Sequence, residues 1–123
     1  MLCAAAAAVA AAPAAEPIPI ALIEGLSGSF GNAGEAVYRN LLLAVERVNR
    51  RGGVRLPGGA RSLELLRFDG KGSGEESLAM LRAALDRRVA FVAQGNSSAV
   101  AMVLVDALNK HNQREPLSRA LLL

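Results

Sequence analysis

The sequence predicts an α/β fold with an open, parallel β-sheet in which strands and helices alternate as β-α-β-α-β-α-β. Two Gly/Ser-rich turns, residues 25–34 (GLSGSFGNAG) and 95–98 (GNSS), each follow an apolar, strand-like run and precede an amphipathic helix. Of the 123 residues, 52% are hydrophobic but only 3% are aromatic, so Ala, Val and Leu must fill the core between the sheet and the helices. We expect the strand order 2-1-3-4 with right-handed crossovers.

One strand and one long helix are predicted in the first half of the chain. Residues 18–24 (IPIALIE) form a largely apolar run that favours a strand, and Pro19 is tolerated near its start. A helix is expected over 34–51, because one of its faces carries apolar residues at helical spacing, namely Val37, Leu41, Val45 and Val48. The glycines at 52–53 end this helix, and residues 57–59 (PGG) form an exposed turn.

The second half of the chain is predicted to contain three strands and two helices. The partly alternating pattern of 63–68 is typical of a strand at the edge of a sheet. Ser73 and Glu76 form a capping box that begins the second helix. Residues 89–93 are uniformly apolar, as in a central strand, and residues 119–123 begin a fourth strand. The third helix, between them, has the clearest apolar stripe: Val100, Val103, Leu104, Ala107 and Leu108.

Composition and residue chemistry argue against several classes of function. The formal net charge is +3, but the basic residues are dispersed among acidic ones and no aromatic surface accompanies them, so we expect no nucleic-acid binding. The glycines of the first turn recur every three residues and do not form the GxGxxG pattern of dinucleotide-binding proteins. With one histidine, His111, and one cysteine, Cys3, the chain offers almost no material for a metal site or a nucleophile–base pair. We therefore predict a protein that is not an enzyme and that uses no metal or cofactor.

The first 15 residues differ in composition from the rest of the chain. Residues 4–12 are an apolar run (AAAAAVAAA), and the following residues fit the small-x-small pattern of a signal-peptide cleavage site. Residues 1–3 carry no Lys or Arg, so an Ala-rich tail is the alternative. We interpret residues 1–15 as a clipped signal peptide, which predicts export to the periplasm and leaves residues 16–123 as the folded part.

A candidate ligand site lies at the carboxyl ends of the strands. In a 2-1-3-4 sheet the connections reverse direction between the first and third strands, and ligands bind at that point. The two Gly/Ser-rich turns follow those two strands, so they would face each other across one crevice. Ser97 and Ser98 stand at the start of the third helix, where free N–H groups favour an anion such as a carboxylate. Gly95, which permits close approach of the backbone, and Asn96 complete this turn.

The first turn adds Ser27 and Phe30 as candidate ligand contacts. A structural interpretation stands beside each of these assignments: either serine of the second turn would cap its helix, and the first turn would be a flexible connection. We expect one serine of the pair 97–98 to cap the helix and the other to contact the ligand.

Three stretches of the sequence resemble one known family. Residues 18–54 contain Leu26-Ser27-Gly28 after a strand and Asn49-Arg50-Arg51-Gly52-Gly53 at a helix end. Two further stretches, LELLRFDGKGSGEESLAMLRAAL and VAFVAQGNSSAVAMVLVDALNKHN, each read as a strand, a turn and a helix. In their order and spacing, these stretches are similar to the amino-terminal lobe of the periplasmic branched-chain amino acid binding proteins of ABC transporters.

The resemblance implies a bilobal, type I solute-binding fold that closes on an amino acid or a related small molecule, and a permease as the partner of the whole protein. In that family a serine after the third strand holds the ligand carboxylate, which corresponds here to Ser97 or Ser98. The chain would then be an incomplete amino-terminal lobe that does not bind ligand well by itself. Two other functions remain open at this point: a ligand-sensing lobe of a receptor or regulator, and a flavodoxin-like cofactor domain.

Overall fold

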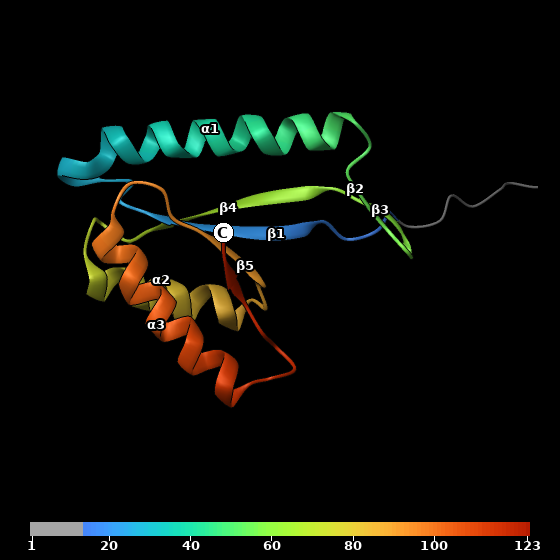
Figure 1. Ribbon diagram of the computed structural model, residues 1–123. Helices are drawn as coiled ribbons and strands as arrows, with labels where there is room; N and C mark the ends of the chain where they lie inside the picture. Colours follow the sequence, from blue (N-terminus) through green and yellow to red (C-terminus); the bar gives the residue numbers. More distant parts are fainter. Residues whose placement is uncertain (1–13) are drawn as a thin grey trace, which may run out of the picture.

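A four-stranded parallel sheet is the centre of the computed structural model, which describes residues 14–123 (Figure 1). Its strands are β1 (Ile18–Glu24), β4 (Leu63–Asp69), β5 (Phe91–Ala93) and β6 (Leu121–Leu122). They lie in the order β4-β1-β5-β6, and each neighbouring pair is parallel. The predicted α/β class and the strand order 2-1-3-4 are confirmed.

Three helices cover the two faces of this sheet. Helix α1 (Gly31–Arg50) lies on one face, above β4, whereas α2 (Gly74–Asp86) and α3 (Ser98–Arg114) lie together on the opposite face (Figure 1). Helix α2 contacts β1 and β4, and α3 contacts α2 and β6. Each helix follows a strand and leads back to a parallel one, so all three are crossover connections.

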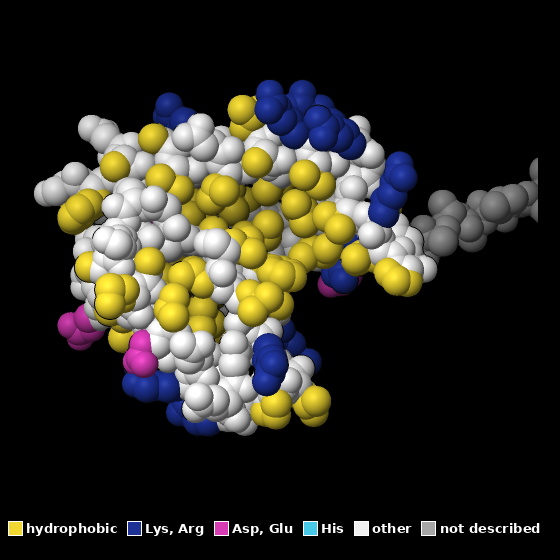
Figure 2. Space-filling view, in the orientation of Figure 1, with side chains coloured by type: hydrophobic (Ala, Val, Ile, Leu, Met, Phe, Trp, Pro, Cys, Tyr) yellow, Lys and Arg dark blue, Asp and Glu magenta, His cyan; other side chains and the backbone are white. Residues whose placement is uncertain are grey.

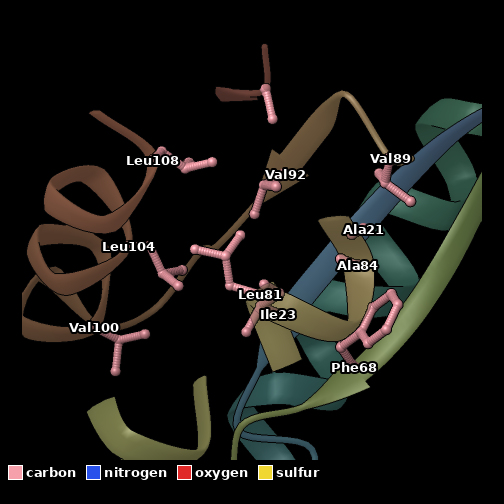
Figure 3. Close-up of a cluster of buried hydrophobic side chains, with 11 residues drawn as sticks. Ala21, Ile23, Phe68, Leu81, Ala84, Val89, Val92, Val100, Leu104 and Leu108 are labelled. Carbon is pink, nitrogen blue, oxygen red and sulfur yellow. The ribbon is translucent and has the colours of Figure 1, made fainter. Parts of the chain in front are cut away.

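The main hydrophobic core lies between the sheet and the pair of helices α2 and α3. Ile23 of β1 and Val92 of β5 face Leu81 of α2 and Leu104 of α3, as Figure 3 shows. Leu104 and Val92 have no exposed surface. The expectation of a core made chiefly of aliphatic residues is confirmed, since Phe68 is the one aromatic residue in this cluster.

The structure corrects several predicted boundaries. Helix α1 begins at Gly31 rather than at residue 34, and a short 3-10 turn, η1 (Gly28–Phe30), precedes it. The strand predicted over 89–93 begins at Phe91, and the one predicted over 119–123 is reduced to Leu121–Leu122. The predicted helix began too late because the glycines at 28, 31 and 34 were assigned to a turn, in which glycine is common.

An antiparallel hairpin that the sequence did not predict connects α1 to β4. Its strands are β2 (Val54–Leu56) and β3 (Gly59–Arg61), and the predicted turn at 57–59 lies at its tip. The side chain of Arg61 donates hydrogen bonds to the carbonyl oxygens of Glu16, at 2.7 Å, and Pro17, at 3.2 Å. The hairpin therefore holds the segment that leads into β1.

Two asparagines near helix ends hold the start of the next sheet strand. Asn49 of α1 donates to the carbonyl oxygen of Leu63 and accepts from its amide, at 2.9 and 2.8 Å. Asn112 of α3 makes the same pair of bonds with Ala120, at 2.8 and 2.9 Å. Each carboxamide thus pairs with both the N–H and the C=O of one backbone residue, as a neighbouring strand would. Asn49 of the Asn-x-x-Gly-Gly motif therefore has a structural role.

The predicted signal peptide lies almost wholly outside the described residues. Of residues 1–15, the structure describes Ala14 and Ala15, which are exposed and belong to no helix or strand. Within residues 14–123, no helix combines the length and the apolar character that a membrane span requires.

Candidate functional site

The loops after β1, β4 and β5 meet at the carboxyl edge of the sheet, and two carboxylates hold them there. Glu24 and Asp69 are the last residues of β1 and β4 and lie opposite each other in the strand register. Each carboxylate accepts hydrogen bonds from backbone N–H groups of two segments. The edge is therefore organised by side chains of the strands themselves.

Glu24 joins the loop after β1 to the loop after β5. Its Oε1 accepts from the amide of Gly25 at 3.1 Å, and its Oε2 accepts from the amide of Gly95 at 2.8 Å. The side chain is buried, with 2% of the residue's surface exposed. The predicted meeting of the two Gly/Ser-rich turns is confirmed by this bond to Gly95. Sequence reasoning missed Glu24; the available signal was an acidic residue at the end of an otherwise apolar strand.

Asp69 joins the loop after β1 to the loop after β4. Its Oδ1 accepts from the amides of Leu26, at 2.9 Å, and Lys71, at 2.8 Å. Burial acts to raise the pKa of this carboxyl, but hydrogen bonds from the Ser27 hydroxyl and from these two amides, with the charge of Lys71, outweigh it and hold the pKa below its ordinary value. Asp69 is thus stabilised in its charged form.

The two serines after β5 have different roles in the structure. Ser97 is the N-cap of α3, and its Oγ accepts from the amide of Val100 at 3.3 Å. Ser98 is the first residue of the helix and is exposed. Within the described residues, the amides of Ser98 and Ala99 donate to no backbone or side-chain acceptor. The helix start therefore keeps two free N–H groups and one free hydroxyl side chain next to the loop.

The other predicted residues of this loop are exposed, but one of their donors is already used. Gly95 and Asn96 both lie at the surface. The amide of Gly95 donates to Glu24, so it is not free for a ligand. A Cβ at Gly95 would lie 2.6 Å from Cγ1 of Val37, which shows that close contact with α1 is what requires glycine here.

Ser27 and Phe30 lie on the loop after β1, as predicted. Ser27 is exposed and precedes the 3-10 turn η1. Phe30 is 46% exposed, and its ring lies against the backbone of Gly72 in the loop after β4: a Cβ there would be 2.2 Å from Cδ2 of the ring. Gly72 also has a φ of +70°, which favours glycine. Phe30 therefore lies at the carboxyl edge of the sheet, between the loop after β1 and the loop after β4.

An ion pair fixes the first turns of α1 over β4, close to these loops. Arg67 of β4 pairs with Glu35 of α1, and its guanidinium lies 4.2 Å from the centroid of the Tyr38 ring. The hydrogen bond and charge of Glu35 raise the pKa of Arg67 above its ordinary value. Both side chains are partly exposed, so this pair orients the helix and adds little stability.

A separate groove of about 820 Å³ lies between α2 and α3, away from the loop edge. Its floor is apolar and its rim carries charges of both signs; the lining includes Leu78, Leu81, Leu85, Met102, Val103, Arg82, Asp106 and Lys110. None of the predicted site residues lines it. Hydrophobic side chains are also visible between α1 and α3 in Figure 2, and among the exposed ones Leu121 belongs to β6 and Leu123 follows it.

A parallel sheet whose loops converge at one carboxyl edge, with two N–H groups at a helix start that are unpaired among the residues described, defines an α/β lobe with a candidate anion site. The particular family follows from comparison: residues 17–116 match the model of the family described as periplasmic binding protein, and the chain belongs to that family. The similarity to the branched-chain amino acid binding proteins that the sequence predicted is confirmed.

Relatives of known sequence and structure agree with this assignment. A Leu/Ile/Val-binding protein homolog 4 from Brucella abortus is 31% identical over 105 residues, which cover 85% of this chain and 24% of the relative. The crystal structure of a leucine-, isoleucine-, valine-, threonine- and alanine-binding protein from Brucella ovis, in its closed conformation, is 29% identical, with a TM-score of 0.79 over 88% of this chain and 27% of its own. An ABC transporter substrate-binding protein from Sphaerobacter thermophilus is 32% identical, with a TM-score of 0.63 over 76% of this chain and 24% of its own. The chain thus spans about a quarter of the length of the curated relatives that it matches.

Proposed function

We propose that this chain contributes one wall of the ligand site of an ABC-transporter substrate-binding protein for amino acids or related small molecules. The bond between Glu24 and the amide of Gly95 is the observation that carries the proposal, since it brings the loops after β1 and β5 together at the reversal point of the sheet. Relatives that are named for binding Leu, Ile and Val, and one named as a transporter component, support the ligand class.

The ligand carboxylate is proposed to bind at the start of α3. The amides of Ser98 and Ala99 are unpaired within the described residues, and the helix dipole favours negative charge at this end. The Ser98 hydroxyl adds a third donor, because Ser97, not Ser98, caps the helix. Asn96, Ser27 and Phe30 are proposed to line the same crevice, where the exposed ring of Phe30 would cover apolar parts of a ligand.

The remaining partners follow from the same proposal. The other walls of the site are expected from the three quarters of the relatives that this chain does not match. A permease of the inner membrane would be the protein partner, and the periplasm the compartment. The relatives are binding proteins, and we propose that binding without chemical conversion is the function of this chain as well.

Saturation-transfer difference NMR on the 123-residue chain tests the ligand class. The chain is mixed with L-leucine, L-valine and D-ribose in equal amounts, and transfer to each is compared. Since a single wall buries little of a small ligand, binding is expected in the millimolar range, with transfer to the amino acids and none to the sugar. The variant S98A should weaken that transfer, whereas the control S118A, at an exposed serine in the segment after α3, should leave it unchanged. Equal transfer to all three compounds, or transfer that S98A leaves unchanged, would contradict the proposal.

A further inference from the structure

Glu24 is an unusual residue for the end of an inner strand of a parallel sheet. Among the described residues it is the one charged side chain that is buried, and it belongs to none of their ion pairs. A buried carboxylate without a cation is unfavourable unless hydrogen bonds replace its hydration, and an apolar residue in its place is often neutral or stabilising. The stability of the sheet therefore gives no reason for an acid at this position.

The bonds of this carboxylate indicate what it does. Both of its oxygens accept from backbone amides of loops, Gly25 at 3.1 Å and Gly95 at 2.8 Å, and the second of these lies three residues before Ser98. On its other side, Gly95 packs against Val37 of α1 so closely that a Cβ would lie 2.6 Å from Cγ1. The loop after β5 is thus held from two sides, by a strand residue and by a helix residue.

We infer that Glu24 is a positioning residue for ligand binding: it fixes the backbone of the loop after β5, and through it the free amides of Ser98 and Ala99, in the geometry that receives an anionic group. This inference rests on the proposed function for the identity of the ligand, but the loop geometry that it describes can be measured without one. Glu24 does not itself contact the ligand, because its carboxylate is buried and occupied.

The test compares E24Q with the matched control E64Q, a glutamate exposed on β4. Glutamine has nearly the volume of glutamate but presents one N–H₂ group where the carboxylate presents an acceptor, so one of the two amides loses its partner. Hydrogen exchange of the amides of Gly25, Gly95, Ser98 and Ala99 is followed by NMR, together with the thermal transition and the shifts that L-leucine induces at Ser98 and Ala99.

For E24Q we expect a cooperative thermal transition and a several-fold weaker response to L-leucine, together with exchange about tenfold faster than in E64Q at whichever of the Gly25 and Gly95 amides faces the new N–H₂ group. Exchange rates and leucine shifts equal to those of E64Q would overturn the inference. If the unsubstituted chain shows no response to L-leucine while E24Q still frees the Gly95 amide, the positioning of the loop stands and the proposed ligand is wrong.

A second measurement does not depend on whether E24Q folds. In the unsubstituted chain, a through-hydrogen-bond coupling is expected between the amide nitrogen of Gly95 and the carboxylate carbon of Glu24, and its absence would overturn the inference. E24D supplies a second variant, because it keeps the charge but withdraws the carboxylate by one methylene. Faster exchange of the Gly95 amide is expected there too, and an unchanged rate would count against the inference.

Discussion

The amide of Gly95 lies 2.8 Å from Oε2 of Glu24, so a residue of the loop after β5 is bonded to the last residue of β1. These two strands are neighbours in the sheet although they lie far apart in the sequence. The bond places the loop that begins α3 beside the loop that begins α1, and the geometry of the carboxyl edge depends on it.

Gly95→Ala is expected to destabilise the protein, because its Cβ would lie 2.6 Å from Cγ1 of Val37. Overpacking of this kind costs about 1–3 kcal/mol of the free energy of unfolding, which urea denaturation measures. Adding Val37→Ala should restore part of the loss, since it removes the methyl groups that clash. Gly58→Ala is the control, because nothing lies within 4 Å of a Cβ there. Equal effects at positions 95 and 58 would contradict this reading of the packing.

Gly31→Ala and Gly34→Ala, both in the first turns of α1, should have opposite effects. A Cβ at Gly34 would lie 2.0 Å from the carbonyl oxygen of Gly25, a backbone atom that cannot move aside, and we expect a loss of about 3 kcal/mol. A Cβ at Gly31 meets nothing closer than 3.6 Å, so the better helix propensity of alanine should add about 0.5 kcal/mol. Thermal denaturation of the two variants side by side checks this, and a tolerated alanine at 34 would show that the helix does not approach the loop so closely.

Asp69→Asn should change the acid stability of the protein. The pKa of Asp69 is lowered in the folded state from its ordinary 3.8, so its stabilisation is complete above that value and is lost as the pH falls through the folded-state pKa. The free energy of unfolding of the unsubstituted chain should therefore fall more steeply below about pH 4 than that of D69N. Asp86→Asn, at the exposed end of α2, should follow the unsubstituted chain. Parallel pH profiles for all three would refute the role given to Asp69.

Asn112→Ala should destabilise the attachment of β6. The variant loses two hydrogen bonds to the backbone of Ala120, so the amide and carbonyl of Ala120 are left without partners. This loss should lower the free energy of unfolding by about 1–3 kcal/mol. Asn109→Ala, on the exposed side of the same helix, should change stability by less than about 0.5 kcal/mol. Faster exchange of the Leu121 and Leu123 amides in N112A alone would locate the effect at β6; similar exchange in both variants would exclude it.

The sequence predicts the sheet well because its inner strands are buried and are therefore apolar in sequence. Residues 89–93 and 18–24 are apolar runs between turn residues, and their neighbourhood in the sheet follows from the rules for parallel connections. The hairpin β2–β3 was missed because each strand has three residues, too few to show alternation, and lies among glycines and a proline. The start of α1 was missed because the glycines at 31 and 34 look like a turn, whereas close packing on the loop is what requires Gly34.

The location of the candidate site could be predicted from the sequence, but its individual hydrogen bonds could not. The loops containing Ser27 and Ser97 were expected to meet, since both follow strands at the reversal point of the sheet. The bonds of Glu24 were not predictable, because a side chain at a strand end selects its partners only when the loops are in place. For the same reason, the sequence did not distinguish the capping serine, Ser97, from Ser98.

The central claim, that the start of α3 receives the anionic group of an amino acid, is tested most directly by mapping a leucine titration on the backbone amides of the 123-residue chain. The predicted result is a set of shift changes centred on Ser98 and Ala99, with smaller ones in residues 26–30, that S98A weakens and that 3-methylbutan-1-amine, which is leucine without its carboxylate, does not produce. Shift changes centred on the groove between α2 and α3, or none at millimolar leucine, would contradict the claim.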